Sequence, residues 1–352
     1  MGPTAGDTMK NNSTAHSPSL DANDLKCFSR EILKLSALSG CTSAVNWLHE
    51  AILIFRNVVS FDSAWWGQVY IPAESSMPRN LMHGSIGLSA SFAEEWAEIS
   101  GVDCFANSSI SCLGKAVRDS GSDALKAESE EVAAFCKRHD IFHSMAVTEE
   151  FPSSRTLFFV SINRRKSSPE FGDAESILME EFFNHLTYCW RSYLSMIRSD
   201  GLPSLWDNYA LASTQGKLLY IGRDIGEVIS EKYADWKGSS LPGNVSRLVS
   251  HVPCTVYADG RQGMMVQPCG DLIALMLCSR QQFSPLSPRE LSAANIYSLG
   301  HSYKEVARIL GVTPATARTY LRSAYVQLGV SNKVELITAL RQAGGKSEAH
   351  SP

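Results

Sequence analysis

The chain has 352 residues, a net charge of −4 and 44% hydrophobic residues, which predicts two or three domains with ordinary apolar cores. No apolar run reaches the roughly 18 residues of a membrane span, so we expect no membrane partner. The nine cysteines are scattered without a Cys-x-x-Cys pair, which argues against a zinc cluster and a disulfide framework. Because the N-terminus also lacks an apolar signal-peptide stretch, we expect a cytoplasmic protein.

Residues 1–22 are rich in small polar residues and are predicted to be a disordered tail. Beyond it, apolar spacing predicts helices over Leu25–Leu38, Ala44–Val59, Asp123–Arg138 and Phe171–Met196. Strands are predicted over Ala64–Ile71, Asn80–Leu88, Ile141–Val147 and Thr156–Asn163. Helices that flank an antiparallel sheet predict an α+β sensory region over residues 23–199, similar to a GAF or PAS domain.

A second, smaller unit is predicted to follow. Gly and Pro within Asp200–Ser204 are typical of a domain boundary. Leu211–Tyr220 and Leu272–Cys278 are predicted strands around a polar middle, which favours a PAS-like domain over residues 205–280. Residues Gln281–Leu286 then form a linker to the C-terminal region.

The densest aromatic patch of the sensory region is Phe61–Gly67. Successive strand side chains point to opposite faces, so at most one of Trp65 and Trp66 is expected to line a pocket. An aromatic wall beside Asp62 or Tyr70 suits a small, partly apolar effector, whereas core packing is the other explanation for two adjacent tryptophans. Trp65, Trp66 and Tyr70 are therefore the candidate ligand-binding residues.

Nothing in this region indicates catalysis or a metal. His139 and His143 are four residues apart, but no third ligand accompanies them, so no metal site is assigned. The sequence has no Gly-rich phosphate loop, nucleophile elbow or carboxylate pair, so no catalytic residue and no cofactor is assigned.

Residues 286–340 contain the start and stop signals of four short helices. The starts are marked by Ser287-Pro288 with Glu290, Ser302 with Glu305, Thr313-Pro314, and Asn332 with Glu335. The stops are the glycines Gly300, Gly311 and Gly329. The short segment Gly311–Thr313 between the second and third helices predicts a helix-turn-helix.

The third of these helices has two faces. Its apolar face is formed by Ala317, Tyr320, Leu321, Ala324, Tyr325 and Leu328. On the other face, the guanidinium groups of Arg318 and Arg322 suit guanine edges, and Thr319 suits a base or a thymine methyl. We therefore predict that Arg318, Thr319 and Arg322 read DNA bases. We also predict that the phosphates of the DNA backbone are bound by Lys304, Thr313 and Thr316.

The motifs Leu286–Glu290, Gly300–Ala307, Val312–Arg322 and Leu328–Asn332 resemble, in order and spacing, the LuxR-type (GerE-like) DNA-binding domain. The resemblance covers about one sixth of the chain. It implies an all-α, four-helix helix-turn-helix domain over residues 283–345, with the third helix as recognition helix and the fourth commonly supplying a dimer contact. The sequence departs from the family pattern at Ala317, Tyr320, Ala324 and Gln327.

Charge favours DNA as the partner. Residues 283–345 hold seven Lys and Arg against three Glu, a net charge of +4, which leaves −8 on the rest of the chain. A basic module on an acidic body suits phosphate binding. The main hypothesis is a sequence-specific transcription regulator with sensory domains for a small effector. We expect a homodimer on double-stranded DNA, because one recognition helix covers too few base pairs.

Two alternatives stay open. The chain is a protein-binding antagonist or scaffold if its helix-turn-helix no longer contacts DNA, as the departures at Ala317, Tyr320 and Gln327 suggest. The other alternative is an enzyme fused to a DNA-binding domain, which no catalytic residue in the sequence favours.

Overall fold

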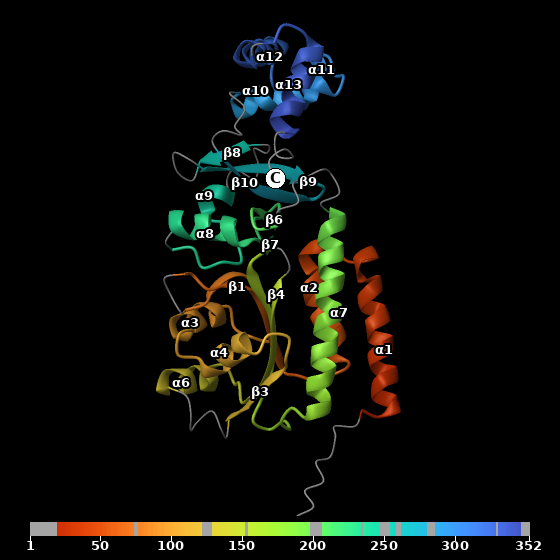
Figure 1. Ribbon diagram of the computed structural model, residues 1–352, viewed down its shortest axis with the longest axis vertical. Coiled ribbons are helices and arrows are strands. Elements are labelled where there is room, and N and C mark those ends of the chain that lie inside the picture. The colour runs from red at the N-terminus through yellow and green to blue at the C-terminus, as the bar shows by residue number, and fades with distance from the viewer. Residues whose placement is uncertain are drawn as a thin grey trace, which may run out of the picture.

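The computed structural model describes residues 20–73, 77–121, 129–151, 154–197, 206–233, 235–246, 254–257, 262–279, 286–328 and 330–345. Three groups of elements follow one another along its long axis: a sheet with helices on both faces, a second sheet, and a group of four helices (Figure 1). Within these ranges, no helix has both the length and the apolar character needed to cross a membrane.

The first sheet has the strand order β2-β1-β5-β4-β3, and all its neighbours are antiparallel. Its strands are β1 (Ser63–Tyr70), β2 (Arg79–Ile86), β3 (Val117–Ser120), β4 (His143–Phe151) and β5 (Thr156–Arg164). One face is covered by α1 (Ala22–Ala37), α2 (Trp47–Arg56) and α7 (Asp173–Ile197). The other face is covered by α3 (Phe92–Ile99), α4 (Cys104–Ser111) and α6 (Glu130–Arg138) (Figure 1).

The core between α2 and α7 is aromatic. Phe55 stacks on Phe182 with ring centroids 4.4 Å apart, and Trp47 lies 5.2 Å from Trp190. These α7 side chains follow the spacing of a buried helical stripe, which is why a helix from Phe171 to Met196 was predictable. Burial of several large rings at this spacing fixes α7 against the sheet.

The second sheet has the order β7-β6-β10-β9-β8 and is also antiparallel. Its strands are β6 (Tyr209–Ser213), β7 (Leu218–Ile221), β8 (Cys254–Tyr257), β9 (Gln262–Cys269) and β10 (Leu272–Ser279), with helices α8 (Arg223–Lys232) and α9 (Gly243–Ser246). Counted from its own first strand, this sheet repeats the order of the first one: second, first, fifth, fourth, third. The predicted α+β, GAF/PAS-like fold class is thus confirmed.

The prediction of one strand over Leu211–Tyr220 is wrong. The segment is a hairpin, in which Gly216 has a φ of +86° and reverses the chain between β6 and β7. The predicted polar middle contains β8 and β9, whose pattern of apolar residues is too short or too interrupted to indicate strands. The predicted boundary Asp200–Ser204 lies outside the described residues, as do residues 1–19 of the predicted tail and 281–285 of the predicted linker.

The two sheets are joined by polar contacts. The buried Gln68 amide nitrogen donates to Thr156 Oγ1 at 3.0 Å, and its oxygen accepts from the Ile221 backbone N–H at 3.1 Å. Arg155 forms ion pairs with Asp207 and Asp224. Apolar side chains of both sheets also belong to one continuous hydrophobic cluster. The first and second sheets therefore pack as one unit.

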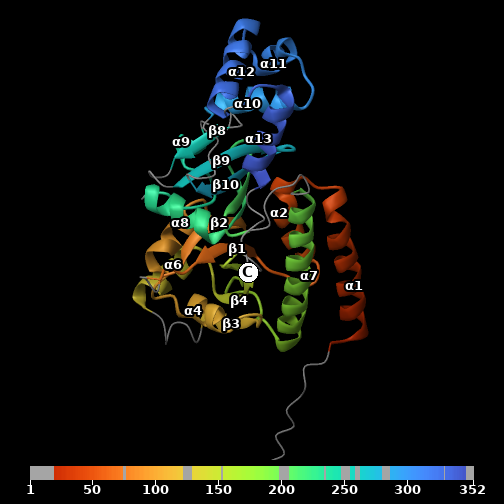
Figure 2. The same ribbon diagram turned by 45° about the horizontal axis from the view of Figure 1, so that its top comes forward.

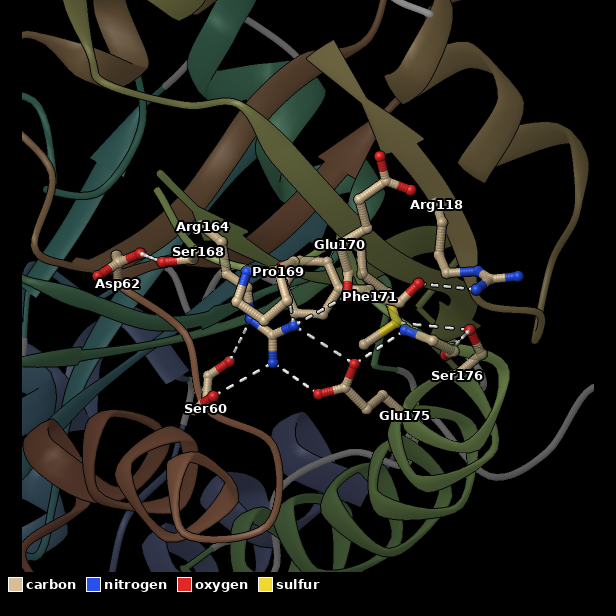
Figure 3. A network of polar contacts seen from close by, with 12 residues as sticks. Ser60, Asp62, Arg118, Arg164, Ser168, Pro169, Glu170, Phe171, Glu175 and Ser176 are labelled. Atoms are coloured by element: carbon tan, nitrogen blue, oxygen red, sulfur yellow. Dashed lines mark hydrogen bonds and ion pairs between the residues drawn. The ribbon is translucent and has the colours of Figure 1, made fainter. Parts of the chain in front are cut away.

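Arg164 at the end of β5 is the centre of a buried polar network (Figure 3). Its guanidinium pairs with Glu175 Oε1 at 2.6 Å, donates to the Ser60 carbonyl oxygen at 2.8 Å and lies 4.1 Å from the Phe171 ring centroid. The start of α7 is thereby tied to the end of β5 and to the segment before β1. Asp62, in the same network, accepts from Ser168 Oγ and from the Arg165 backbone N–H, and it does not line the cavity next to Trp65.

The C-terminal group consists of α10 (Pro288–Ser298), α11 (Tyr303–Leu310), α12 (Pro314–Leu328) and α13 (Lys333–Gly345). The capping boxes at Ser287 and Ser302 are confirmed, as is Gly311, which ends α11 in the left-handed conformation with a φ of +64°. The Glu335 N–H donates to Asn332 Oδ1 at 2.9 Å at the start of α13. The predicted stop at Gly329 lies outside the described residues.

Candidate functional site

The exposed face of α12 carries the three predicted base-reading residues. Arg318, Thr319 and Arg322 are all exposed, whereas Ala317, Leu321 and Ala324 on the opposite face are buried against the other helices. Helix α10 lies next to β8, and α12 lies farther from the two sheets in both views (Figures 1 and 2). The small buried alanines let α12 approach α10 and α11 closely, which leaves its polar face directed outward.

Arg318 is held by a residue that sequence reasoning missed. Its guanidinium carbon lies 4.0 Å from the ring centroid of Tyr303, and Nη2 donates to Tyr303 Oη at 2.5 Å. Tyr303 is the first residue of α11, so the contact links the two helices of the helix-turn-helix. The sequence signal was the aromatic residue directly after the Ser302 cap, on the helix that packs against α12.

The hydroxyl groups of the three threonines have local partners. Thr319 Oγ1 donates to the Ala315 carbonyl oxygen at 3.1 Å, so toward a base it is left with an accepting oxygen and its methyl group. Thr313 Oγ1 accepts from the Thr316 N–H at 3.2 Å and lies 2.8 Å from Thr316 Oγ1. The N-terminus of α12 is thus capped by Thr313, while Lys304 is exposed in the first turn of α11.

A cavity of about 90 Å³ lies between the first sheet and helices α3, α4 and α6. Its aromatic wall is formed by Trp65 of β1, Phe159 of β5, Phe92 and Trp96 of α3, Phe105 of α4 and Phe135 of α6. Of the candidate ligand-binding residues, only Trp65 lines this cavity. Trp66 and Tyr70 belong to the core on the other face of β1, because alternate strand residues point to opposite faces.

The polar groups around this cavity are mostly paired with each other. Asp103 caps α4 through the Ala106 N–H at 2.9 Å and accepts from Trp96 Nε1 at 2.8 Å. Burial raises the pKa of the Asp103 carboxyl, and these hydrogen bonds oppose that rise. Ser109 and Thr148 share a hydrogen bond of 2.7 Å. Trp65 Nε1, by contrast, is buried and has no hydrogen-bond partner among the described residues.

Several cavity residues were not predicted from the sequence. Phe92, Trp96 and Ile99 have the i, i+4, i+7 spacing of a buried helix face, which would have indicated α3. Asp103 precedes α4 as its N-cap, the position at which Asp is favoured. Both helices have only eight residues, which is why their pattern is weak.

The two histidines considered for a metal have other partners. His139 Nε2 lies 3.2 Å from Glu95, and His143 Nδ1 lies 3.2 Å from Ser120 Oγ. Over the part of the chain that the structure describes, no cluster of three or more His, Cys, Asp or Glu side chains is arranged to hold a metal ion.

Residues 284–340 match the family described as "Bacterial regulatory proteins, luxR family". The chain thus carries a helix-turn-helix domain of the luxR family at its C-terminal end, as the motifs predicted. Over 64 residues it is 36% identical to the "HTH-type transcriptional activator RamA" of Corynebacterium glutamicum, a match that covers 18% of this chain and 23% of that relative. The chain therefore spans about a quarter of the length of the curated relative it matches.

Two solved structures are similar over longer stretches at low identity. SdiA of Escherichia coli is 10% identical with a TM-score of 0.38, and the match covers 90% of this chain and 98% of that chain. The bacteriophytochrome RpBphP3 of R. palustris is 11% identical with a TM-score of 0.36, with 75% of this chain and 64% of that chain covered.

Proposed function

We propose that this chain is a cytoplasmic transcription regulator that binds double-stranded DNA as a homodimer and responds to a small effector. The observation that carries the proposal is the exposed row Arg318, Thr319 and Arg322 on α12 of a luxR-family helix-turn-helix. Two arginines at i and i+4 place their guanidinium N–H donors on one helix face, which suits guanine edges and phosphates in a major groove. The net charge of +4 on residues 283–345 supports the same partner.

The experiment is a selection of binding sites from a random duplex library with the full-length chain at near-physiological salt. We expect recovery of a two-fold-symmetric site, because a dimer places two recognition helices about one helical turn apart. The matched control is the double variant Arg318→Ala, Arg322→Ala, which should select nothing. Recovery of no site, together with DNA affinity that barely depends on salt, would favour the protein-binding antagonist instead.

Effector binding is assigned to the cavity beside Trp65. It is lined by aromatic side chains with a few polar groups, the usual lining of a small-molecule site. Gln68 and Arg155 connect the first sheet to the second, and α10 lies next to β8 of the second sheet. A structural change at the cavity can therefore reach the helix-turn-helix through these contacts. If this assignment holds, a cavity ligand changes the affinity of the full-length chain for its selected site.

A further inference from the structure

A second cavity, of about 300 Å³, lies on the side of the first sheet that α2 and α7 cover. Part of its wall comes from the first sheet and these helices. The rest comes from Lys217, directly before β7, and from Leu218 and Leu219 within β7. Strand β2 also lines the cavity, and it contacts both α2 and β7. The cavity therefore lies where the two sheets meet, and a ligand in it touches both.

The inner wall of this cavity is apolar and aromatic. Trp66 of β1 and Trp190 of α7 are both buried there, with 4% and 1% of their surface exposed. The His49 ring of α2 meets Trp66 edge-on at a centroid distance of 6.1 Å. Gly84 of β2 leaves room for the indole, because a Cβ at this position would lie 2.5 Å from the Trp66 ring. A small apolar group of a ligand is stabilised by packing against this wall.

Two charged side chains of opposite sign line the same cavity. Lys217 is the one Lys or Arg among its described lining residues, and Glu50 of α2 is the one Asp or Glu. Within the described part of the chain, neither side chain forms an ion pair or a hydrogen bond. Burial and the positive charge of Lys217 lower the pKa of His83, another lining residue, to about 4, so this imidazole is uncharged at neutral pH. A ligand thus meets one ammonium group and one carboxylate.

This pair of charges restricts the ligand. An anion would pair with Lys217 but would bring a second negative charge into the cavity that Glu50 lines, and a cation would do the reverse. A zwitterion satisfies both side chains. We infer that this cavity binds a small zwitterion with an apolar body, the chemistry of an apolar α-amino acid, whose carboxylate pairs with Lys217 and whose ammonium group pairs with Glu50. The site is separate from the cavity beside Trp65 and does not rest on the effector role proposed there.

The test is isothermal titration calorimetry of the full-length chain at neutral pH with three probes that share one alkyl chain. These are L-norleucine, hexanoate, which lacks the ammonium group, and n-pentylamine, which lacks the carboxylate. We expect saturable binding of L-norleucine. It should bind about fivefold more tightly than either analogue, the upper end for one ion pair near the surface.

Two variants place the ligand. Lys217→Gln should remove the preference for L-norleucine over n-pentylamine, because the carboxylate then has no cation to pair with. Glu50→Gln should remove the preference for L-norleucine over hexanoate in the same way. The matched control is Lys26→Gln, at an exposed lysine of α1 that does not line the cavity, and it should leave all three affinities unchanged.

Equal or tighter binding of either analogue to the unchanged chain would overturn the inference, since at most one of the two charges would then take part. Absence of saturable L-norleucine binding would overturn it as well. An unchanged preference in either cavity variant would show that the zwitterion binds elsewhere. If a variant fails to fold, the comparison of the three probes on the unchanged chain still decides.

Discussion

The Arg318 guanidinium carbon lies over the Tyr303 ring, 4.0 Å from its centroid, and Arg318 Nη2 donates to the Tyr303 hydroxyl. The two residues come from α12 and α11, so the contact spans the turn of the helix-turn-helix. An arginine side chain has many rotamers, and ordering it at a DNA interface costs about 0.5–1.5 kcal/mol. Tyr303 restricts these rotamers in the absence of DNA, and we predict that it thereby prepares Arg318 for a contact with a base.

Replacing Tyr303 should therefore weaken specific binding. For Tyr303→Leu we expect about a three- to tenfold loss of affinity for the selected site, since the arginine must then be ordered on binding. Affinity for random duplex should change little. Fluorescence anisotropy with both duplexes measures the two values.

The matched control is Tyr297→Leu. Tyr297 in α10 also contacts a cation through its ring, Lys333 at 4.3 Å, but that cation is not on the recognition helix. Its replacement should leave the ratio of specific to random affinity unchanged. An unchanged or raised ratio in Tyr303→Leu would show that the tyrosine does not prepare Arg318, or that it competes with DNA for the arginine.

Replacing Arg322 should reduce the sequence specificity of DNA binding, whereas replacing Lys304 should reduce the affinity for every sequence. Arg322→Ala is expected to cost about 1–3 kcal/mol at the selected site and to relax one base position, because an arginine pairs with guanine through two bonds. Lys304→Ala should weaken all sequences alike and lower the slope of log affinity against log salt by about 1. Affinities over a salt series, with the site and its single-base variants, distinguish the two. Equal loss on every sequence in Arg322→Ala would make Arg322 a phosphate contact.

The helix-turn-helix was predictable because its signals are local. Ser302 with Glu305 and the left-handed Gly311 act within one turn of the chain, so the residues alone show where α11 begins and ends. The exposed face of α12 follows from the same periodicity. The partner of Arg318 was not predictable in this way, because Tyr303 meets it only after α11 and α12 have packed.

The region of the two sheets was predicted less fully, since its contacts are distant in sequence. The strand with Trp65 was found, but the face of β1 that lines a cavity depends on α3 and α4, two short helices without strong signals. Gln68 joins Thr156 and Ile221 across 88 and 153 residues, a pairing that one sequence does not reveal.

Gln68→Leu should destabilise the joint between the sheets. The leucine fits the volume but leaves the Ile221 N–H without its acceptor, which costs about 1–3 kcal/mol for a buried donor. Urea unfolding measures the loss. The same change at the half-buried Gln267 in β9 is the control and should cost less. Equal losses at the two positions would mean that the Gln68 hydrogen bonds contribute nothing beyond packing.

Arg155 forms two ion pairs and has a backbone conformation that is unusual for a residue with a Cβ. Its φ is +48°, a region in which a residue with a Cβ is strained by about 1–2 kcal/mol. Both Arg155→Ala and Arg155→Gly lose the pairs with Asp207 and Asp224, but only glycine relieves the strain. We expect Arg155→Gly to be more stable than Arg155→Ala by about 1 kcal/mol in urea unfolding.

Arg165 supplies the reverse control. It also forms an ion pair, with Asp140 at 3.1 Å, but it is not among the residues with positive φ. Here Arg165→Gly should be less stable than Arg165→Ala, because glycine loses more backbone freedom on folding. The same order of stability at both positions would contradict the strain at Arg155.

The stability of the chain should fall in mild acid through His83. Burial, together with the positive charge of Lys217, lowers the pKa of His83 to about 4 from its ordinary 6.5. Between these values the unfolded chain takes up a proton that the folded chain does not, so stability is complete above pH 6.5 and is lost as pH falls toward 4. For this half-buried side chain the loss amounts to about 2 kcal/mol.

Urea unfolding at pH 7.0, about 5.5 and about 4.5 measures this loss of stability, and His83→Asn should remove that part of the pH dependence. Lys217→Gln, which removes the nearby positive charge, should reduce the loss without abolishing it, because burial is the larger cause. An identical pH dependence in the chain with His83 and in His83→Asn would mean that His83 titrates normally in the folded state.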